Sequence, residues 1–257
     1  MSFELIKDVR SITGAGMSDV KKALDEAGGD KDKAIEILRK KGQKIAAKKS
    51  DREIKEGVIA LSKDGDKLAI VGLGCETDFV ARNEDFQNAV EDLAKKLLEM
   101  GKDEFENWAT KYIQDELITK IGENLQLANF DILEGKIIGT YLHSNKKVAA
   151  AIVLSEGSEE IAREIAMHTA AMAPGYLKPE DVPTAELDKE REIYAEQLKK
   201  EGKPENMIAK ISEGKINKYY TEVCLLKQNF VKEDKKPIEK FLEENKAVIE
   251  TFGYYSL

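Results

Sequence analysis

Apolar side chains recur every three to four residues along the first 42 positions, which is the spacing of amphipathic helices. Three such stripes follow one another: Leu5, Val9 and Ile12, then Val20, Ala23, Leu24 and Ala27, then Ala34, Ile35 and Leu38. Ser18 and Asp30 are residue types that cap helices, and glycines punctuate the pattern. We expect a compact three-helix module whose helices end at residues 14–16, 28–29 and Gly42.

From Gly57 onward the apolar positions form short runs instead. Residues 58–61 and 68–73 flank an Asp-Gly turn signal at residues 63–66, which predicts a β-hairpin. A helix is expected over residues 83–100, because one face collects the apolar side chains Phe86, Val90, Leu93, Leu97 and Leu98.

The same order of elements recurs roughly 80 residues later. Residues 139–143 and 148–154 read as a second hairpin around a turn at 144–147, and a helix starts near Glu159. Because a hairpin alone cannot bury its apolar face, each hairpin needs its own helices. The chain is therefore expected to contain two related halves, each with an antiparallel sheet and helices.

Residues 184–228 are strongly charged and again helical in period. Two stretches, 186–201 and 206–227, flank Gly202 and Pro204, which predicts an antiparallel helical hairpin of the coiled-coil type that serves as an interaction arm. We therefore predict an α+β protein of three parts. These are a three-helix module with a basic linker (1–54), a core N-subdomain (55–138), and a core C-subdomain (139–257) that carries the arm at about 184–228.

Composition indicates a folded protein rather than a disordered one, with 42% hydrophobic and 35% charged residues. No apolar run approaches the roughly 18 to 20 residues of a membrane span, and the N-terminus lacks signal-peptide features, so a cytoplasmic location without membrane contact is expected. The net charge of −8 argues against direct nucleic-acid binding. Residues 1–56 carry +3 and the remainder −11, which fits either a separate partner surface or a solvated face.

The sequence contains no enzyme signature that we recognise. It has no phosphate-binding glycine loop and no serine elbow, and its two histidines, His143 and His168, stand too far apart for a zinc pair. Cys75 is open to two interpretations, a thiol nucleophile or a small buried residue at a strand end. The acidic residues 25–32 lack the ligand spacing of a calcium loop. We expect neither enzymatic activity nor a bound cofactor or metal.

Residues 75–82 run from a strand end into a loop before a helix. Phe79 stands there between Asp78 and Arg82, an apolar residue with polar neighbours. From the pattern alone, packing of Phe79 against the following helix is favoured over a role as an exposed anchor.

Residues 9–24 and 76–82 resemble two signatures of the translation elongation factor Ts family. Residues 120–124, 139–143 and 167–171 are also similar to segments of that family, so the resemblance covers nearly the whole chain. It implies an N-terminal module similar to ubiquitin-associated domains, two related core subdomains and a coiled-coil hairpin. It also implies a guanine-nucleotide exchange factor for elongation factor Tu.

The resemblance assigns partner contacts residue by residue. Phe79 is expected to enter an apolar pocket between helices of the partner's nucleotide-binding domain, with Thr77, Asp78 and Val80 beside it. A second group would grip another helix of that domain: Arg10, Met17, Lys49, Ile121, Gly122 and His143. Each also has an ordinary structural interpretation, for example Ile121 as core, Gly122 as a helix terminator and His143 as a polar residue at a strand end.

Two departures and two open alternatives accompany the resemblance. Many family members continue past the strand matching residues 251–257 into a helix that packs on the partner, so weaker contact is expected at that end. Ser18 replaces a frequent methionine and removes some apolar contact. A non-catalytic adaptor that binds a helix or a ubiquitin-like surface remains an alternative function, and self-association through the core or the hairpin remains open.

Overall fold

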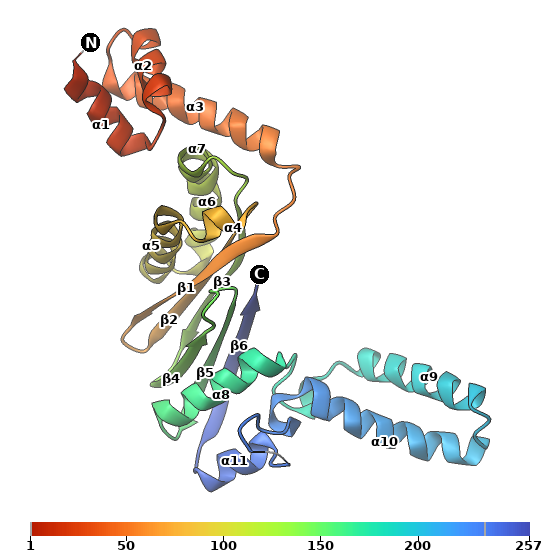
Figure 1. Ribbon diagram of the computed structural model, residues 1–257. Coiled ribbons are helices and arrows are strands. Elements are labelled where there is room, and N and C mark those ends of the chain that lie inside the picture. The colour runs from red at the N-terminus through yellow and green to blue at the C-terminus, as the bar shows by residue number, and fades with distance from the viewer. Residues whose placement is uncertain (1, 234) are drawn as a thin grey trace. The chain divides into compact units, whose positions relative to one another are not determined.

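The computed structural model describes residues 2–233 and 235–257. It is mixed helix and sheet, with two antiparallel three-stranded sheets in the orders β1-β2-β3 and β4-β5-β6 (Figure 1), so the α+β prediction is confirmed. Two compact units result, each described here by itself. The first comprises the chain up to residue 133 with residues 142–148 and 255–257, and the second comprises residues 134–141 and 149–254.

The N-terminal module consists of α1 (Phe3–Thr13), α2 (Met17–Glu26) and α3 (Lys31–Lys49). Its core contains most of the predicted apolar positions, with Val9, Val20, Leu24, Ala34 and Leu38 all buried. Ile12 of the first stripe is instead 49% exposed. Gly14 ends α1 in the left-handed conformation at φ 64°, and the Asp30 carboxylate caps α3 by accepting from the Lys33 backbone N–H.

Two helix boundaries in this module differ from the prediction. Ser18 lies inside α2, because that helix already begins at Met17 after Gly16. Gly42 does not end α3, which continues to Lys49. A Cβ atom at Gly42 would lie 2.3 Å from the Thr119 hydroxyl oxygen and 2.9 Å from the Asp115 carbonyl oxygen. Gly42 therefore permits close helix packing.

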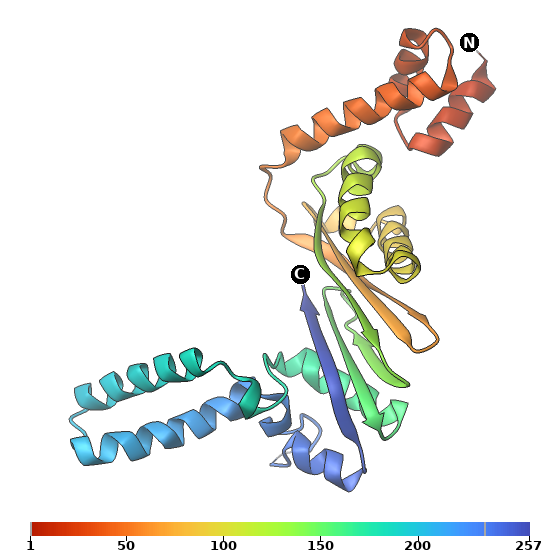
Figure 2. The same ribbon diagram turned by 180° about the vertical axis from the view of Figure 1, so that it is seen from behind.

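The rest of the first unit is built on the hairpin of β1 (Glu56–Asp64) and β2 (Lys67–Cys75), whose antiparallel register places Ile59 opposite Gly72. The helix α5 (Glu84–Met100) is capped by Asn83 and was predicted, as was the hairpin. Figures 1 and 2 show α5 and α6 (Lys102–Tyr112) over one face of this sheet. The buried core between them includes Val71, Leu73, Phe86, Leu93, Leu97 and Phe105.

None of the elements of this unit from α6 to its third strand was predicted. After α6 comes a π-helical turn, η1 (Ile113–Leu117), then α7 (Ile118–Ile121) and the strand β3 (Gln126–Glu134). The strand completes the first sheet next to β2.

The second unit repeats the arrangement with β4 (Ile137–Leu142), β5 (Val148–Glu156) and α8 (Glu159–Met172), as predicted. Its third strand is β6 (Val248–Ser256), which follows α11 (Ile238–Glu244). The core between sheet and helices contains Ile152, Leu154, Ile165, Leu225, Ile238 and Phe241.

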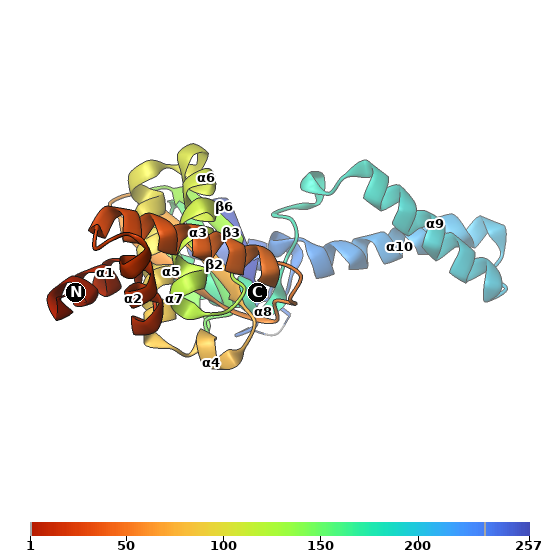
Figure 3. The ribbon, with the colours of Figure 1, turned by 90° about the horizontal axis from the view of Figure 1, so that it is seen from above.

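The helical hairpin is formed by α9 (Thr184–Lys200) and α10 (Glu205–Val223), which run alongside each other away from the sheet of the second unit (Figure 3). Leu198, Ile208 and Ile216 are buried in the narrow seam between them. At the base, the Glu186 carboxylate accepts from the hydroxyls of Tyr176 and Tyr219. In the described residues, no helix combines the length and apolar character needed to cross a membrane.

The second predicted helix of this hairpin was four residues too long. It ends at Val223 instead of residue 227, because the chain turns there into the short 3-10 helix η3 (Leu225–Lys227). The Leu225 N–H donates to the carbonyl of Tyr176 at 2.8 Å, shortly before the 3-10 helix η2 (Pro179–Asp181) in the chain. This pairing closes the base of the hairpin.

Candidate protein-binding site

Phe79 lies in α4 (Asp78–Ala81), a single helical turn directly after β2. Its side chain is 83% exposed, so the expectation that it packs against the following helix is wrong. Val80 and Ala81 face the core instead. Asp78 pairs with the Arg82 guanidinium at 3.2 Å, and Thr77 caps the turn. The chain thus displays a large aromatic side chain in water beside a charged pair.

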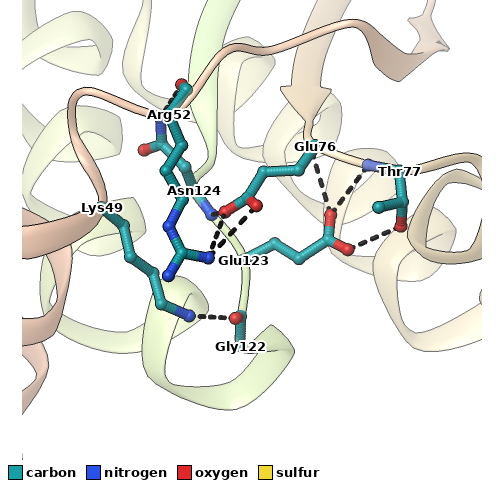
Figure 4. Close-up of polar contacts among 7 residues, drawn as sticks. All are labelled: Lys49, Arg52, Glu76, Thr77, Gly122, Glu123 and Asn124. Carbon is teal, nitrogen blue, oxygen red and sulfur yellow. Dashed lines mark hydrogen bonds and ion pairs between the residues drawn. The ribbon is translucent and has the colours of Figure 1, made fainter.

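The backbone that leads into this turn is fixed by one carboxylate, that of Glu123 (Figure 4). Its Oε2 atom accepts from the backbone N–H groups of Glu76 and Thr77, both at 3.0 Å. Its Oε1 atom accepts from the Thr77 hydroxyl at 2.6 Å. Three charge-assisted hydrogen bonds therefore converge on two consecutive residues.

A second layer of contacts joins this turn to the end of α3. Glu76 accepts from the Asn124 backbone N–H at 2.6 Å and from the Arg52 guanidinium at 3.3 Å. These donors, Asn124 first, lower the pKa of the Glu76 carboxyl. The Asn124 amide donates to the Arg52 carbonyl at 3.0 Å, and the Lys49 ammonium donates to the Gly122 carbonyl. Segments 49–52, 76–77 and 122–124 thus form one hydrogen-bonded cluster.

Several of the residues that the sequence assigned to partner contacts therefore gather in one region. Lys49 and Gly122 touch each other, and Glu123 connects them to Thr77 and its neighbours. Gly122 ends α7 at φ 88°, as its structural interpretation required, yet it is exposed. Ile121 is half-buried against the core.

The remaining candidates also belong to the first unit. Arg10 is exposed in the last turn of α1, and Met17 is 51% exposed at the start of α2. His143 follows β4 in the loop whose Lys146 carbonyl accepts from the Ile59 N–H at 2.7 Å. A hollow lies between this loop and α4, lined by Glu56, Asp78, Ala81, Arg82, Gln87 and residues 144–147.

Cys75 has the features of a structural residue. It is fully buried, and its thiol donates to the Thr77 carbonyl at 3.3 Å. Burial, followed by the negative charge of Glu123, raises the pKa of Cys75 to about 12. Because the thiolate is the reactive form, these surroundings disfavour a nucleophile at neutral pH.

His168 is also buried and belongs to the second unit. One ring nitrogen lies 3.1 Å from the Gln228 side-chain oxygen, and the other accepts from the Val231 N–H. It is a packed residue of α8. Among the described residues, no three His, Cys, Asp or Glu side chains form a group suited to a metal ion.

Glu76, Glu123, Asn124 and Arg52 were not singled out from the sequence as site residues. The only signal for Glu123 and Asn124 was the family resemblance of segment 120–124, which assigns them no role. The partners of Glu123 lie 46 and 47 positions away, so only the fold identifies them.

Comparisons with known proteins cover the whole chain. A family model described as Elongation factor TS matches residues 76–257. Elongation factor Ts of Hydrogenobaculum sp. (strain Y04AAS1) is 42% identical over 270 aligned positions, which cover 100% of this chain and 98% of that protein. Elongation factor Ts of Deinococcus radiodurans is 42% identical over 247 positions, covering 93% of this chain and 94% of that protein.

Proposed function

Because the chain belongs to the elongation factor Ts family, we propose that it promotes the release of GDP from elongation factor Tu and its reloading with GTP. In this proposal it works in the cytoplasm as a binding protein, without a cofactor and without catalysing a chemical step. The division into a module at 1–54, a subdomain at 55–138 and a subdomain at 139–257 is part of the same proposal.

The observation that carries the proposal is the exposure of Phe79. An aromatic side chain with 83% of its surface in water contributes little to its own fold. Burying it in a partner is worth about 1.5 to 3 kcal/mol, and aromatic anchors in desolvated pockets are typical interface hot spots. The exposed Phe79 is therefore the natural anchor of a protein interface.

To promote exchange, such an anchor only has to displace the groups of the partner that hold the nucleotide. A bound guanine nucleotide depends on a phosphate cradle and on a magnesium ion with strict octahedral geometry. Insertion of Phe79 between helices of the nucleotide-binding domain would shift the groups around that ion, and Asp78 would make polar contacts beside it. Both nucleotide and magnesium would then be held less tightly.

A second contact would hold the partner while the nucleotide leaves. We assign it to the other candidate residues, namely Arg10, Met17, Lys49, Ile121, Gly122 and His143, and we place Thr77 and Val80 with Phe79. Exposed apolar side chains on the N-terminal module support this assignment, since Phe3, Ile12 and Met17 are each at least 49% exposed.

Exchange predicts a reciprocal coupling that is directly measurable. If the chain weakens GDP binding by some factor, GDP must weaken binding of the chain by the same factor, typically about 5- to 150-fold. We expect calorimetric titration of the chain into GDP-loaded elongation factor Tu to give a Kd at least about fivefold weaker than titration into the nucleotide-free protein. Equal Kd values would contradict exchange and leave a non-catalytic adaptor as the better account.

A further inference from the structure

The direction in which Phe79 projects depends on very little structure. The helix α4 has only four residues, and a helix this short does not pay its own nucleation cost in water. Phe79 itself has almost no packing, because 83% of its side chain is exposed. Packing of Val80 and Ala81 holds the far end of the turn against the core. The orientation of the anchor therefore depends also on what fixes the backbone at residues 76–78, where the turn begins.

Glu123 supplies that fixation from outside the turn. Its carboxylate accepts hydrogen bonds from the backbone N–H groups of Glu76 and Thr77, the two residues through which β2 leads into α4. It also accepts a hydrogen bond from the Thr77 hydroxyl, whose oxygen in turn accepts from the Val80 N–H at 3.4 Å as the cap of α4. One carboxylate thus holds both the entry to the turn and the side chain that caps it.

We propose that Glu123 is a positioning residue, which holds the turn at residues 77–80 in its binding conformation before the partner arrives. The effect of Glu123 on exchange rests on the proposed function. The hydrogen bonds that hold the turn do not depend on that function. Ordering a loop during association costs affinity, and a loop that is ordered beforehand avoids that cost. Glu123 would accordingly act on how readily the partner is bound, and Phe79 on how far the nucleotide site is disturbed.

A carboxylate is the side chain that fits these donors. All three contacts come from N–H or O–H groups, so Glu123 must accept at both oxygens. A glutamine has one acceptor oxygen, and its NH₂ group would face a donor in place of the other. Glu123→Gln therefore keeps the size of the side chain and removes part of the anchoring together with its charge.

The exchange assay separates positioning from direct disturbance of the nucleotide. For Glu123→Gln we expect the concentration of the chain that gives half-maximal GDP release to rise about tenfold, with the limiting rate within about twofold of the parent. Glu106→Gln, an exposed glutamate on α6, is the matched control and should match the parent. The positioning role would be overturned if the limiting rate of GDP release fell by the same factor by which the half-saturating concentration rose.

Cys75 provides a readout that needs no partner. Its thiol contacts the Thr77 carbonyl, and both burial and the Glu123 charge disfavour the thiolate. A loosened turn without that charge should expose Cys75 and lower its pKa. Iodoacetamide at about pH 8.5, with peptide mass spectrometry, should therefore modify Cys75 at least about fivefold faster in Glu123→Gln. Thr77→Val removes the 2.6 Å bond and the cap to the Val80 N–H. It keeps the Glu123 charge and the two backbone N–H bonds to Glu123, so it should raise the rate by less.

Cys224 is the internal control, since it is also buried but lies in the second unit. Burial is the main cause that raises the pKa of Cys224 to about 11. Its modification rate should stay unchanged in both variants. An unchanged Cys75 rate in both variants, or a Cys224 rate that rises in parallel through general unfolding, would overturn the inference. A faster Cys75 reaction in a chain that never stimulates GDP release would uphold the anchoring and reject the proposed function.

Discussion

Phe79→Ala is expected to slow the stimulated release of GDP from elongation factor Tu by at least about tenfold. The expected size follows from the loss of about 1.5 to 3 kcal/mol of burial at the interface, since about 1.4 kcal/mol is a factor of ten in rate. The measurement is the release rate at concentrations of the chain below saturation. Because Phe79 is 83% exposed, its truncation should leave the stability of the chain within about 0.5 kcal/mol.

Val248→Ala is the matched control for that variant. Val248 is also an exposed apolar residue, at 48%, but it lies on β6, remote in sequence from the proposed site. Its release rate should equal that of the parent chain. Equal rates for the parent and Phe79→Ala would show that Phe79 is not the anchor, whatever the chain does to the nucleotide.

Gly139→Ala is expected to destabilise the second unit by about 3 kcal/mol, at the upper end of the cost of overpacking. Gly139 lies on β4 directly against α8. A Cβ atom there would lie 2.2 Å from the Arg163 backbone nitrogen and 2.3 Å from the Ala162 carbonyl carbon. Both are backbone atoms, so the helix as a whole would have to move away from the sheet. Urea unfolding followed by far-UV circular dichroism measures the change.

Gly214→Ala makes the same chemical change at an open position and serves as the control. Gly214 lies within α10, and a Cβ atom there would have no neighbour within 4 Å. Alanine is the better helix former by about 1 kcal/mol, so this variant should equal or exceed the parent in stability. A Gly139→Ala midpoint as high as that of Gly214→Ala would contradict the close approach of α8 to β4.

Elements whose signal is local were predictable from the sequence. Two examples are the β-hairpin around residues 63–66 and the helical hairpin around Gly202. In each, the two segments that flank the turn pack on each other, so a short stretch of sequence contains the whole element. The strand β3 was missed, because its partner β2 is distant in the chain. Its core-facing residues Leu127, Phe130 and Ile132 also break strict alternation.

Gly42 shows how a tertiary contact overrides a local signal. A glycine after a periodic stretch commonly ends a helix, which is why α3 was expected to stop there. The structure uses the missing side chain for contact with Thr119 and Asp115, which no window around Gly42 reveals.

In the candidate site, too, some residues could be predicted from the sequence and others only from the fold. Residues 76–82 and 120–124 stood out in the sequence through their family resemblance, and Phe79 with them. The pattern alone favoured packing of Phe79 against the following helix, and only the resemblance predicted the exposed anchor that the structure has. The role of Glu123 required the fold, since its hydrogen bonds join two segments that are far apart in the chain.

The central claim is that the chain accelerates nucleotide release, and a stopped-flow measurement tests it most directly. Elongation factor Tu loaded with a fluorescent GDP analogue is mixed with excess unlabelled GTP, with and without the chain. The account predicts a release rate that rises with the concentration of the chain and then saturates. A release rate that stays at its spontaneous value at every concentration would contradict it.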